Sequence, residues 1–196
     1  MGLAVFKQSI GEDKIRTLKA LFEIGAQHAK KQIESLIDAN ILIQVPEVGI
    51  VFMSSLRNMS DDNPARFMAC TMEIDGDIPG EGAILLSHNC ARSLVQTMTT
   101  VDDDDLDQGV RILGELVMKN VINIVSQALS LNVTFGEAEV DADAGCDAGL
   151  AYDAEDESIL VVGETNFAIA SKGIAGEILL LIRLDSLSWL LEHLRV

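Results

Sequence analysis

Positive charge is scarce in this chain. Its 196 residues include 14 lysines and arginines against 31 aspartates and glutamates, which gives a formal net charge of −17. Such an acidic surface repels phosphate groups, so we expect no nucleic-acid partner. The acidic clusters at Asp102–Asp105 and Asp141–Glu157 are interpreted as a helix N-terminus and a solvated loop.

Cysteine and histidine are also scarce. The three cysteines (Cys70, Cys90 and Cys146) and the three histidines show no spacing typical of a zinc site. The stretch Asp141–Gly149 lacks the glycine and the glutamate that a calcium loop places at its sixth and twelfth positions. No phosphate-binding loop, dinucleotide fingerprint or nucleophile elbow is present. The sequence therefore predicts no metal and no cofactor, and it fits a reducing compartment.

Long apolar runs are missing as well. The longest, Ile178–Ile182, is far shorter than the roughly 18 residues that a membrane helix needs. The N-terminal apolar run is too short for a secretory signal. Hydrophobic residues nevertheless make up 48% of the chain, enough for a sizeable core. We therefore predict a cytoplasmic protein without membrane insertion.

Hydrophobic periodicity predicts the elements of the first half. A long helix opens at a capping box on Ser9 and ends near Asn40, with apolar residues every three or four positions. Pro46 is expected to interrupt the following strand, because proline cannot occupy a central ladder position. The strands predicted here are Ile41–Val45, Val48–Met53, Arg66–Ile74 and Glu81–Ser87, followed by a short helix over Asn89–Met98.

The second half repeats this order. A long helix is predicted from Asp102–Asp105 to Leu129, with Leu113, Leu116, Val117, Val121, Ile124, Val125 and Ala128 on its apolar side. It is followed by a strand, an acidic loop and three more strands before a final helix. These elements are Val133–Val140, Asp141–Glu157, Ile159–Glu164, Asn166–Ser171, Glu177–Leu184 and Leu187–Leu194. The apolar residues of this last helix, Trp189 among them, belong either to the core or to a dimer face.

The spacing of the two halves indicates an internal duplication. Glu23 and Pro46 are separated by the same interval as Glu115 and Ala138. We therefore predict one domain over residues 1–196, made of two pseudo-symmetric halves at about 9–100 and 102–194. The expected fold class is α/β, of the α+β type: a continuous antiparallel sheet with two long helices on one face.

Three stretches of the sequence, and the order in which they occur, resemble the CheC/CheX/FliY family of chemotaxis proteins. The fold of that family is also similar to the FliM middle domain. Glu23–Ala29 (EIGAQHA) is similar to the family's NIGAGNA on its first long helix. Gly82–Ser87 with Cys90–Leu94, and Gly176–Leu181 with Ser186 and Leu187, resemble its two strand-then-helix segments. Together these stretches span roughly residues 9–194.

The resemblance implies a substrate and a catalytic pair. Family phosphatases hydrolyse the aspartyl-phosphate of a CheY-type response regulator, with a Glu and, three residues later, an Asn that orients water. In the register fixed by Pro46, the Asn position holds Glu23 and the Glu position holds Ala20, preceded by Arg16. The second half has Glu115, Ile112 and Gln108 at the corresponding positions. Neither half keeps the pair, and a carboxylate at the Asn position would repel a phosphoryl group.

Two interpretations of function follow from the resemblance. In the first, the chain docks a CheY-type response regulator or a flagellar switch component without dephosphorylating it, and CheD is a further possible partner. The second is an active phosphatase with a displaced motif, brought together by a helix slip or bulge, for which Glu23, Glu115 and Asn120 are the catalytic candidates. A register with Ala26 or Met118 at the Asn position is equally incomplete.

The polar stripes of the two long helices supply the candidate binding residues, which are Arg16, Lys19, Gln27, Arg111, Lys119 and Asn123. Arg111, Glu115 and Lys119 are spaced four residues apart, as in a surface ion-pair ladder. A scaffold unrelated to chemotaxis, self-associating through a sheet edge or a helix face, is the third interpretation.

Overall fold

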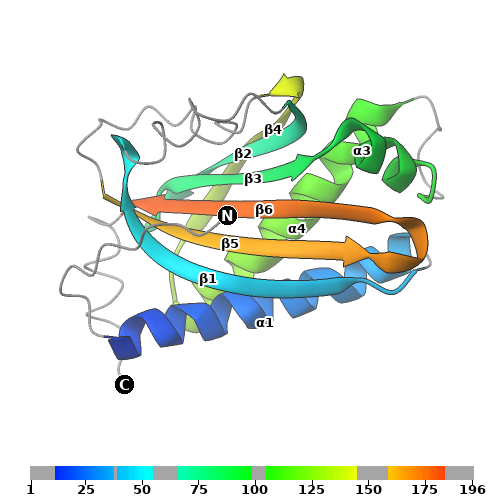
Figure 1. The fold of residues 1–196 in the computed structure, drawn as a ribbon. Coiled ribbons are helices and arrows are strands. Elements are labelled where there is room, and N and C mark those ends of the chain that lie inside the picture. The colour runs from blue at the N-terminus through cyan, green and yellow to red at the C-terminus, as the bar shows by residue number, and fades with distance from the viewer. Residues whose placement is uncertain (1–11, 38, 55–65, 99–104, 145–158, 184–196) are drawn as a thin grey trace.

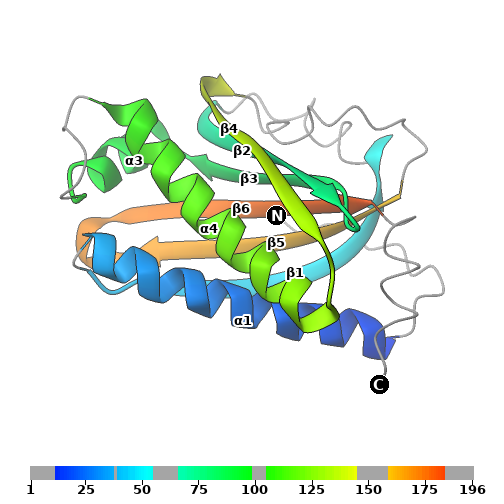
Figure 2. The ribbon, with the colours of Figure 1, turned by 180° about the vertical axis from the view of Figure 1, so that it is seen from behind.

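A computed structural model describes residues 12–37, 39–54, 66–98, 105–144 and 159–183. These residues form an antiparallel sheet of six strands in the order β1-β5-β6-β3-β2-β4. The long helices α1 (Glu12–Ile37) and α4 (Leu106–Leu129) both cover one face of this sheet and cross each other there (Figures 1 and 2). The predicted fold class, with two long helices on one face of an antiparallel sheet, is confirmed.

The first long helix buries the apolar face that its periodicity predicts. Leu18, Phe22, Ala26, Ala29, Ile33 and Ile37 are buried, while Ile15 and Leu36 are partly buried. Its opposite stripe is exposed at Arg16, Ala20, Glu23 and Gln27. The capping box at Ser9 lies outside the described residues.

The second long helix begins as predicted from its acidic N-terminus. The Asp105 side chain accepts a hydrogen bond from the backbone N–H of Gln108 at 3.1 Å and so caps α4. Ser130 ends the helix in the left-handed conformation, with φ of 55°. The predicted apolar side is buried at Leu113, Val117, Val121 and Val125.

The buried surface of α4 is wider than the sequence predicts. Val110, Gly114, Met118, Ile122 and Ser126 are also buried, whereas Ala128 is exposed, contrary to prediction. The reason is that α4 packs on the sheet, on α1 and on α3 (His88–Val95) at once. By length and composition alone α4 could also cross a membrane, a property that buried core helices share.

One edge of the sheet is β1 (Leu42–Phe52), which pairs with β5 (Ile159–Ile169). The two predicted segments on either side of Pro46 are one strand, whose register shifts between Gln44 and Glu47. A bulge on an edge strand accommodates a residue without a backbone N–H, so Pro46 interrupts the ladder without ending the strand.

The hairpin of β2 (Phe67–Gly76) and β3 (Gly80–Leu86) confirms the predicted strands and the turn between them. Gly76 has φ of 107°, a conformation that side chains rarely adopt. The short helix α3 follows, and the Ser87 side chain caps it by accepting from the backbone N–H of Cys90 at 3.3 Å.

The predicted boundaries also fail at two places in the second half. β4 (Val133–Ala144) continues into the stretch expected to be an acidic loop, because Asp141 and Asp143 lie exposed on the other edge strand of the sheet. The two strands predicted around Thr165 are one, β5, because β1 and β6 (Ile174–Arg183) pair with it on both sides. The remainder of the predicted loop and the final helix lie outside the described residues.

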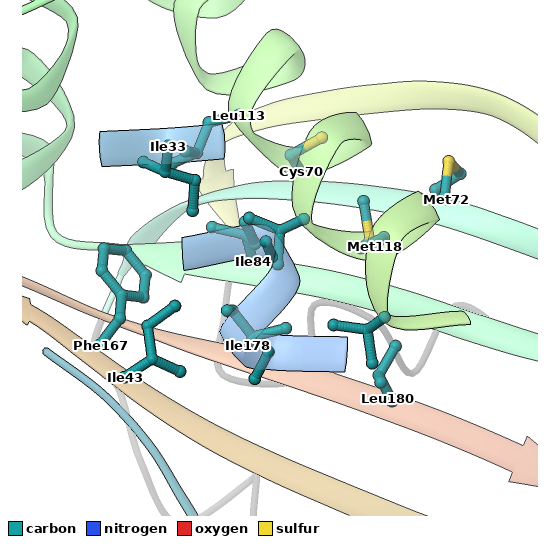
Figure 3. Close-up of a cluster of buried hydrophobic side chains, with 14 of the residues drawn as sticks. Ile33, Ile43, Cys70, Met72, Ile84, Leu113, Met118, Phe167, Ile178 and Leu180 are labelled. Atoms are coloured by element: carbon teal, nitrogen blue, oxygen red, sulfur yellow. The ribbon is translucent and has the colours of Figure 1, made fainter. Parts of the chain in front are cut away.

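The main core fills the space between the sheet and the two long helices. Figure 3 shows part of it, with Ile43, Ile84, Phe167 and Ile178 from the strands and Leu113 from α4. Successive residues of a strand point to opposite faces, so Leu160 and Val162 belong to a second buried cluster on the other face. Around β5 the sheet is therefore buried on both faces.

Candidate functional site

The two long helices touch at Gly25. A Cβ atom added there would lie 2.8 Å from Cα and 3.0 Å from the carbonyl oxygen of Val121. These are backbone atoms, which cannot rotate away as the end of a side chain can. The glycine of the EIGAQHA stretch therefore allows the backbones of α1 and α4 to meet, and this contact fixes where their solvent faces lie.

A pair of side-chain amides joins the same two helices. Gln32 Nε2 donates to Asn120 Oδ1 at 3.0 Å, and Asn120 Nδ2 donates to Gln32 Oε1 at 3.2 Å. Asn120 Nδ2 also donates to the backbone carbonyl oxygen of Leu116 at 2.6 Å. Both ends of the Asn120 amide are therefore engaged in holding α4 to α1.

An open groove of about 700 Å³ follows the solvent side of α4. All of the described residues that line it come from α4 and its N-cap: Asp105, Asp107, Gln108, Arg111, Ile112, Glu115, Leu116, Lys119 and Asn120. The partly buried side chains of Ile112 and Leu116 pack on the core and form an apolar floor. The second-half motif positions, Gln108, Ile112 and Glu115, thus lie in one concave surface.

The predicted ion-pair ladder on α4 is only half formed. Lys119 Nζ lies 2.6 Å from Glu115 Oε2, and both side chains are more than a third exposed, at 39% and 37%. Among the described residues, no carboxylate lies within ion-pair distance of Arg111, which is exposed. Exposed pairs of this kind stabilise a fold by only about a few tenths of a kcal/mol. Arg111 is therefore a guanidinium that the groove leaves available.

The candidate residues of α1 lie on a separate surface. Arg16, Lys19, Glu23 and Gln27 are exposed, and none of the described residues of α1 lines the groove. Arg16 Nη1 forms an ion pair with Asp13 Oδ1 at 3.1 Å. The two sets of candidates, one on each helix, are not brought into one site.

Two partly buried charged residues near the C-terminal end of α1 have a structural role. Glu34 accepts a hydrogen bond from the backbone N–H of Ile41 at 2.9 Å, and Lys30 Nζ lies 3.7 Å from the same carboxylate. These contacts tie the end of α1 to the start of β1.

The geometry of α4 does not assemble a displaced Glu–Asn pair. The helix is α-helical from Leu106 to Leu129, without a slip or bulge. Asn120 follows Glu115 by five residues, so the two side chains point about 140° apart around the axis. Asn123 is exposed but lies about 12 Å further along the helix than Glu115. Residues three apart, as in the family motif, would share a face.

Beneath the groove, Cys70 of β2 packs against Gly114 so closely that a Cβ on that glycine would collide with its sulfur. Burial, and secondarily the Glu115 carboxylate, raises the pKa of the Cys70 thiol to about 12, against a smaller lowering by Arg111. This thiol is therefore protonated at neutral pH and is no nucleophile. Within the described ranges, no three His, Cys, Asp or Glu residues are placed to hold a metal ion.

Sequence reasoning missed two parts of this site. Gln32 was not a candidate, because its pairing with Asn120 depends on how α1 and α4 cross. Asp107 and Leu116 were not candidates for binding either. For Leu116 a usable signal was present, because the i, i+4 spacing places it beside the motif position Ile112 on α4.

Comparisons with known proteins identify the fold. No protein-family model matches the sequence, and no curated protein matches it significantly. The structure of FliY from Thermotoga maritima matches with a TM-score of 0.74 at 14% identity, covering 95% of this chain and 98% of that one. The FliM middle domain from H. pylori matches at 0.68 and 12% identity, covering 94% and 100%. CheX from Vibrio vulnificus matches at 0.56 and 11% identity, covering 85% and 99%.

These similarities confirm the predicted resemblance at the level of the fold. Identities of 11–14% carry no information on whether the residues of a site are shared. The protein therefore has the fold common to FliY, the FliM middle domain and CheX.

Proposed function

We propose that this protein is a CheC-like docking module of chemotaxis or flagellar signalling, which binds a CheY-type response regulator or a flagellar switch component without hydrolysing its phosphoryl group. The observation that carries the proposal is the state of α4. The Asn position of the family motif holds Glu115, and both ends of the nearby Asn120 side-chain amide are hydrogen-bonded, to Gln32 and to Leu116.

The chemistry of aspartyl-phosphate hydrolysis supports a silent site. A protein accelerates this reaction mainly by positioning water in line and by stabilising charge on the phosphoryl oxygens. Glu115 can do neither well, because its carboxylate adds negative charge and is already bonded to Lys119. On α1, Glu23 occupies the same motif position, and Ala20 and Arg16 supply no carboxylate beside it.

Proteins of the same fold support the proposed partner class. Among them, H. pylori FliM was solved in complexes with FliG and with SpeE, and a Vibrio vulnificus structure is of the chemotaxis protein CheX. A chemotaxis or flagellar partner for this chain is our proposal, as are CheD as a second partner and a cytoplasmic location. The α4 groove, which is concave and has an apolar floor with a charged rim, is the surface we assign to docking.

The division into two pseudo-symmetric halves is also a proposal, and the sheet order supports it. Exchanging β1 with β4, β2 with β5 and β3 with β6 reproduces the order β1-β5-β6-β3-β2-β4 in reverse. Ile84 and Ile178, which are equivalent in the repeat, are direct partners in the central β3–β6 pair. A two-fold axis through this pair would relate the two halves.

The test is a combined binding and dephosphorylation assay. A purified CheY-type response regulator is phosphorylated with acetyl phosphate, and its decay is followed with and without an excess of this protein while binding is recorded in the same samples. We expect binding with an unchanged decay rate. Faster decay that is lost in Glu115→Ala or Asn120→Ala would overturn the proposal in favour of a phosphatase with a displaced motif. Absence of binding to this regulator and to flagellar switch proteins would overturn docking.

A further inference from the structure

The α4 groove has an unusual balance of charge for a surface that would receive a phosphorylated protein. The described residues of its rim include three carboxylates, Asp105, Asp107 and Glu115, and two cations, Arg111 and Lys119. Lys119 and Glu115 pair at 2.6 Å and largely cancel each other's charge, so among the described rim residues Arg111 is the cation that remains available to a partner. Sites that recognise phosphoryl groups in proteins instead gather several donors, most often arginines, around the anion.

We propose that the groove recognises an apolar side chain with a neighbouring carboxylate on the partner's surface, and that it binds the partner equally well with or without its phosphoryl group. This inference rests on the proposed docking function and specifies its regulation. The apolar side chain would pack on Ile112 and Leu116, and the carboxylate would pair with Arg111 through its planar, two-pronged guanidinium.

A single carboxylate fits the groove better than a phosphoryl group. A phosphoryl group carries close to two negative charges and would gain one attraction, to Arg111. It would meet repulsion from Asp105 and Asp107, the two rim carboxylates that have no cation partner among the described residues. A partner carboxylate would meet the same two carboxylates with about half of that charge, and a single guanidinium balances it. The phosphoryl group is therefore expected to remain outside the groove and to contribute nothing to affinity.

The position of the apolar floor favours this partner chemistry further. Ile112 and Leu116 are one turn apart on the helix and both are only partly buried. Arg111 and Ile112 both line the groove, so the guanidinium and the floor can be contacted by residues that are near each other on the partner. Binding energy in such interfaces is concentrated in a few central apolar and arginine contacts.

The experiment measures the affinity of the full chain for a purified CheY-type response regulator in two forms, unphosphorylated and activated with beryllofluoride. We expect dissociation constants within about two-fold of each other, because the phosphoryl group remains outside the groove and makes no contact with it. Arg111→Glu and the milder Arg111→Gln are expected to weaken both forms at least ten-fold. The control Arg92→Glu, which changes an exposed arginine of α3 outside the groove, is expected to leave affinity unchanged.

Three outcomes would overturn the inference while leaving docking intact. They are a ten-fold preference for the activated form, normal binding by both Arg111 variants, and loss of binding in Arg16→Glu on α1 instead. Absence of binding by the unaltered chain in either form would overturn the docking function itself. Urea unfolding of each variant shows that it is folded before its affinity is compared.

Discussion

The contact between the long helices at Gly25 predicts that Gly25→Ala lowers the free energy of unfolding, whereas the same change in an exposed helix would raise it. In an exposed helix, Gly→Ala stabilises a protein by about 1 kcal/mol through helix propensity. At Gly25 the added methyl group would meet Cα and the carbonyl oxygen of Val121 at 2.8 and 3.0 Å. Because these are backbone atoms, the helices must separate.

Overpacking of this kind costs about 1–3 kcal/mol, and the closeness of the contact places Gly25→Ala in the upper part of that range. After the gain in helix propensity, we expect a net loss of about 1–2 kcal/mol in the free energy of unfolding. For a chain of this size, each kcal/mol lowers Tm by about 2–4 °C.

The assay is equilibrium unfolding in urea with a thermal scan. Gln27→Ala, an exposed change two residues away on the same helix, is the matched control and should alter stability by less than about 0.5 kcal/mol. If Gly25→Ala proves as stable as the original chain or more stable, the backbone contact at Val121 is wrong. The arrangement of α1 against α4 would then have to be revised.

Three further predictions concern interactions and ionisation. Gln32→Ala and Asn120→Ala, compared singly and together in urea, should show a coupling of about 0.5–1 kcal/mol from their two mutual hydrogen bonds, and additive losses would contradict the pairing. Burial first, and then the nearby Glu164, raises the pKa of the Glu177 carboxyl above its ordinary 4.5. The protonated Glu177 carboxyl therefore contributes fully to stability below pH 4.5, and this contribution is lost as the pH rises through the folded-state pKa. Glu177→Gln should therefore stabilise the protein at pH 7, with a gain that shrinks toward pH 4; a gain that does not change with pH would refute the ionisation argument. The pKa of the buried Cys70 thiol is raised to about 12, so this thiol should not react with N-ethylmaleimide at pH 8 in the native protein. Peptide mass mapping should show the label on the partly exposed Cys90 of the native protein, and on Cys70 only after urea unfolds the chain.

Much of the fold could be predicted because local patterns were consistent with it. The 3.6-residue periodicity of α1 correctly assigned its buried face, and the acidic N-terminus of α4 correctly located its start. The hairpin around Gly76 had strong turn signals on both sides. These features depend on neighbours in sequence, which a single chain displays directly.

Other boundaries depended on partners far away in sequence. β5 reads as two segments around Thr165, but pairing with β1 on one side and β6 on the other supplies hydrogen bonds along its full length. Pro46 reads as a strand break, yet an edge position and a bulge accommodate it. The acidic end of β4 reads as a loop because its side chains are solvent-exposed, whereas its backbone pairs with β2.

The candidate site shows the same division. From the sequence and its family resemblance, the motif positions on both long helices were predicted to lack the Glu–Asn pair, and the charged residues of α4 were predicted to lie on one stripe. The sequence could not show that Asn120 is hydrogen-bonded to Gln32, or that Glu115 forms an ion pair with Lys119 and not with Arg111. Nor could it show that the groove follows α4 rather than α1.

By itself the sequence determined the composition of each element and the acidic charge, because these are properties of residues and their spacing, and through the family resemblance it predicted the absence of the catalytic pair. Only the tertiary structure decided which polar groups remain available to a partner. Availability depends on what each side chain meets across the crossing of α1 and α4, and a glycine contact between two backbones sets that crossing.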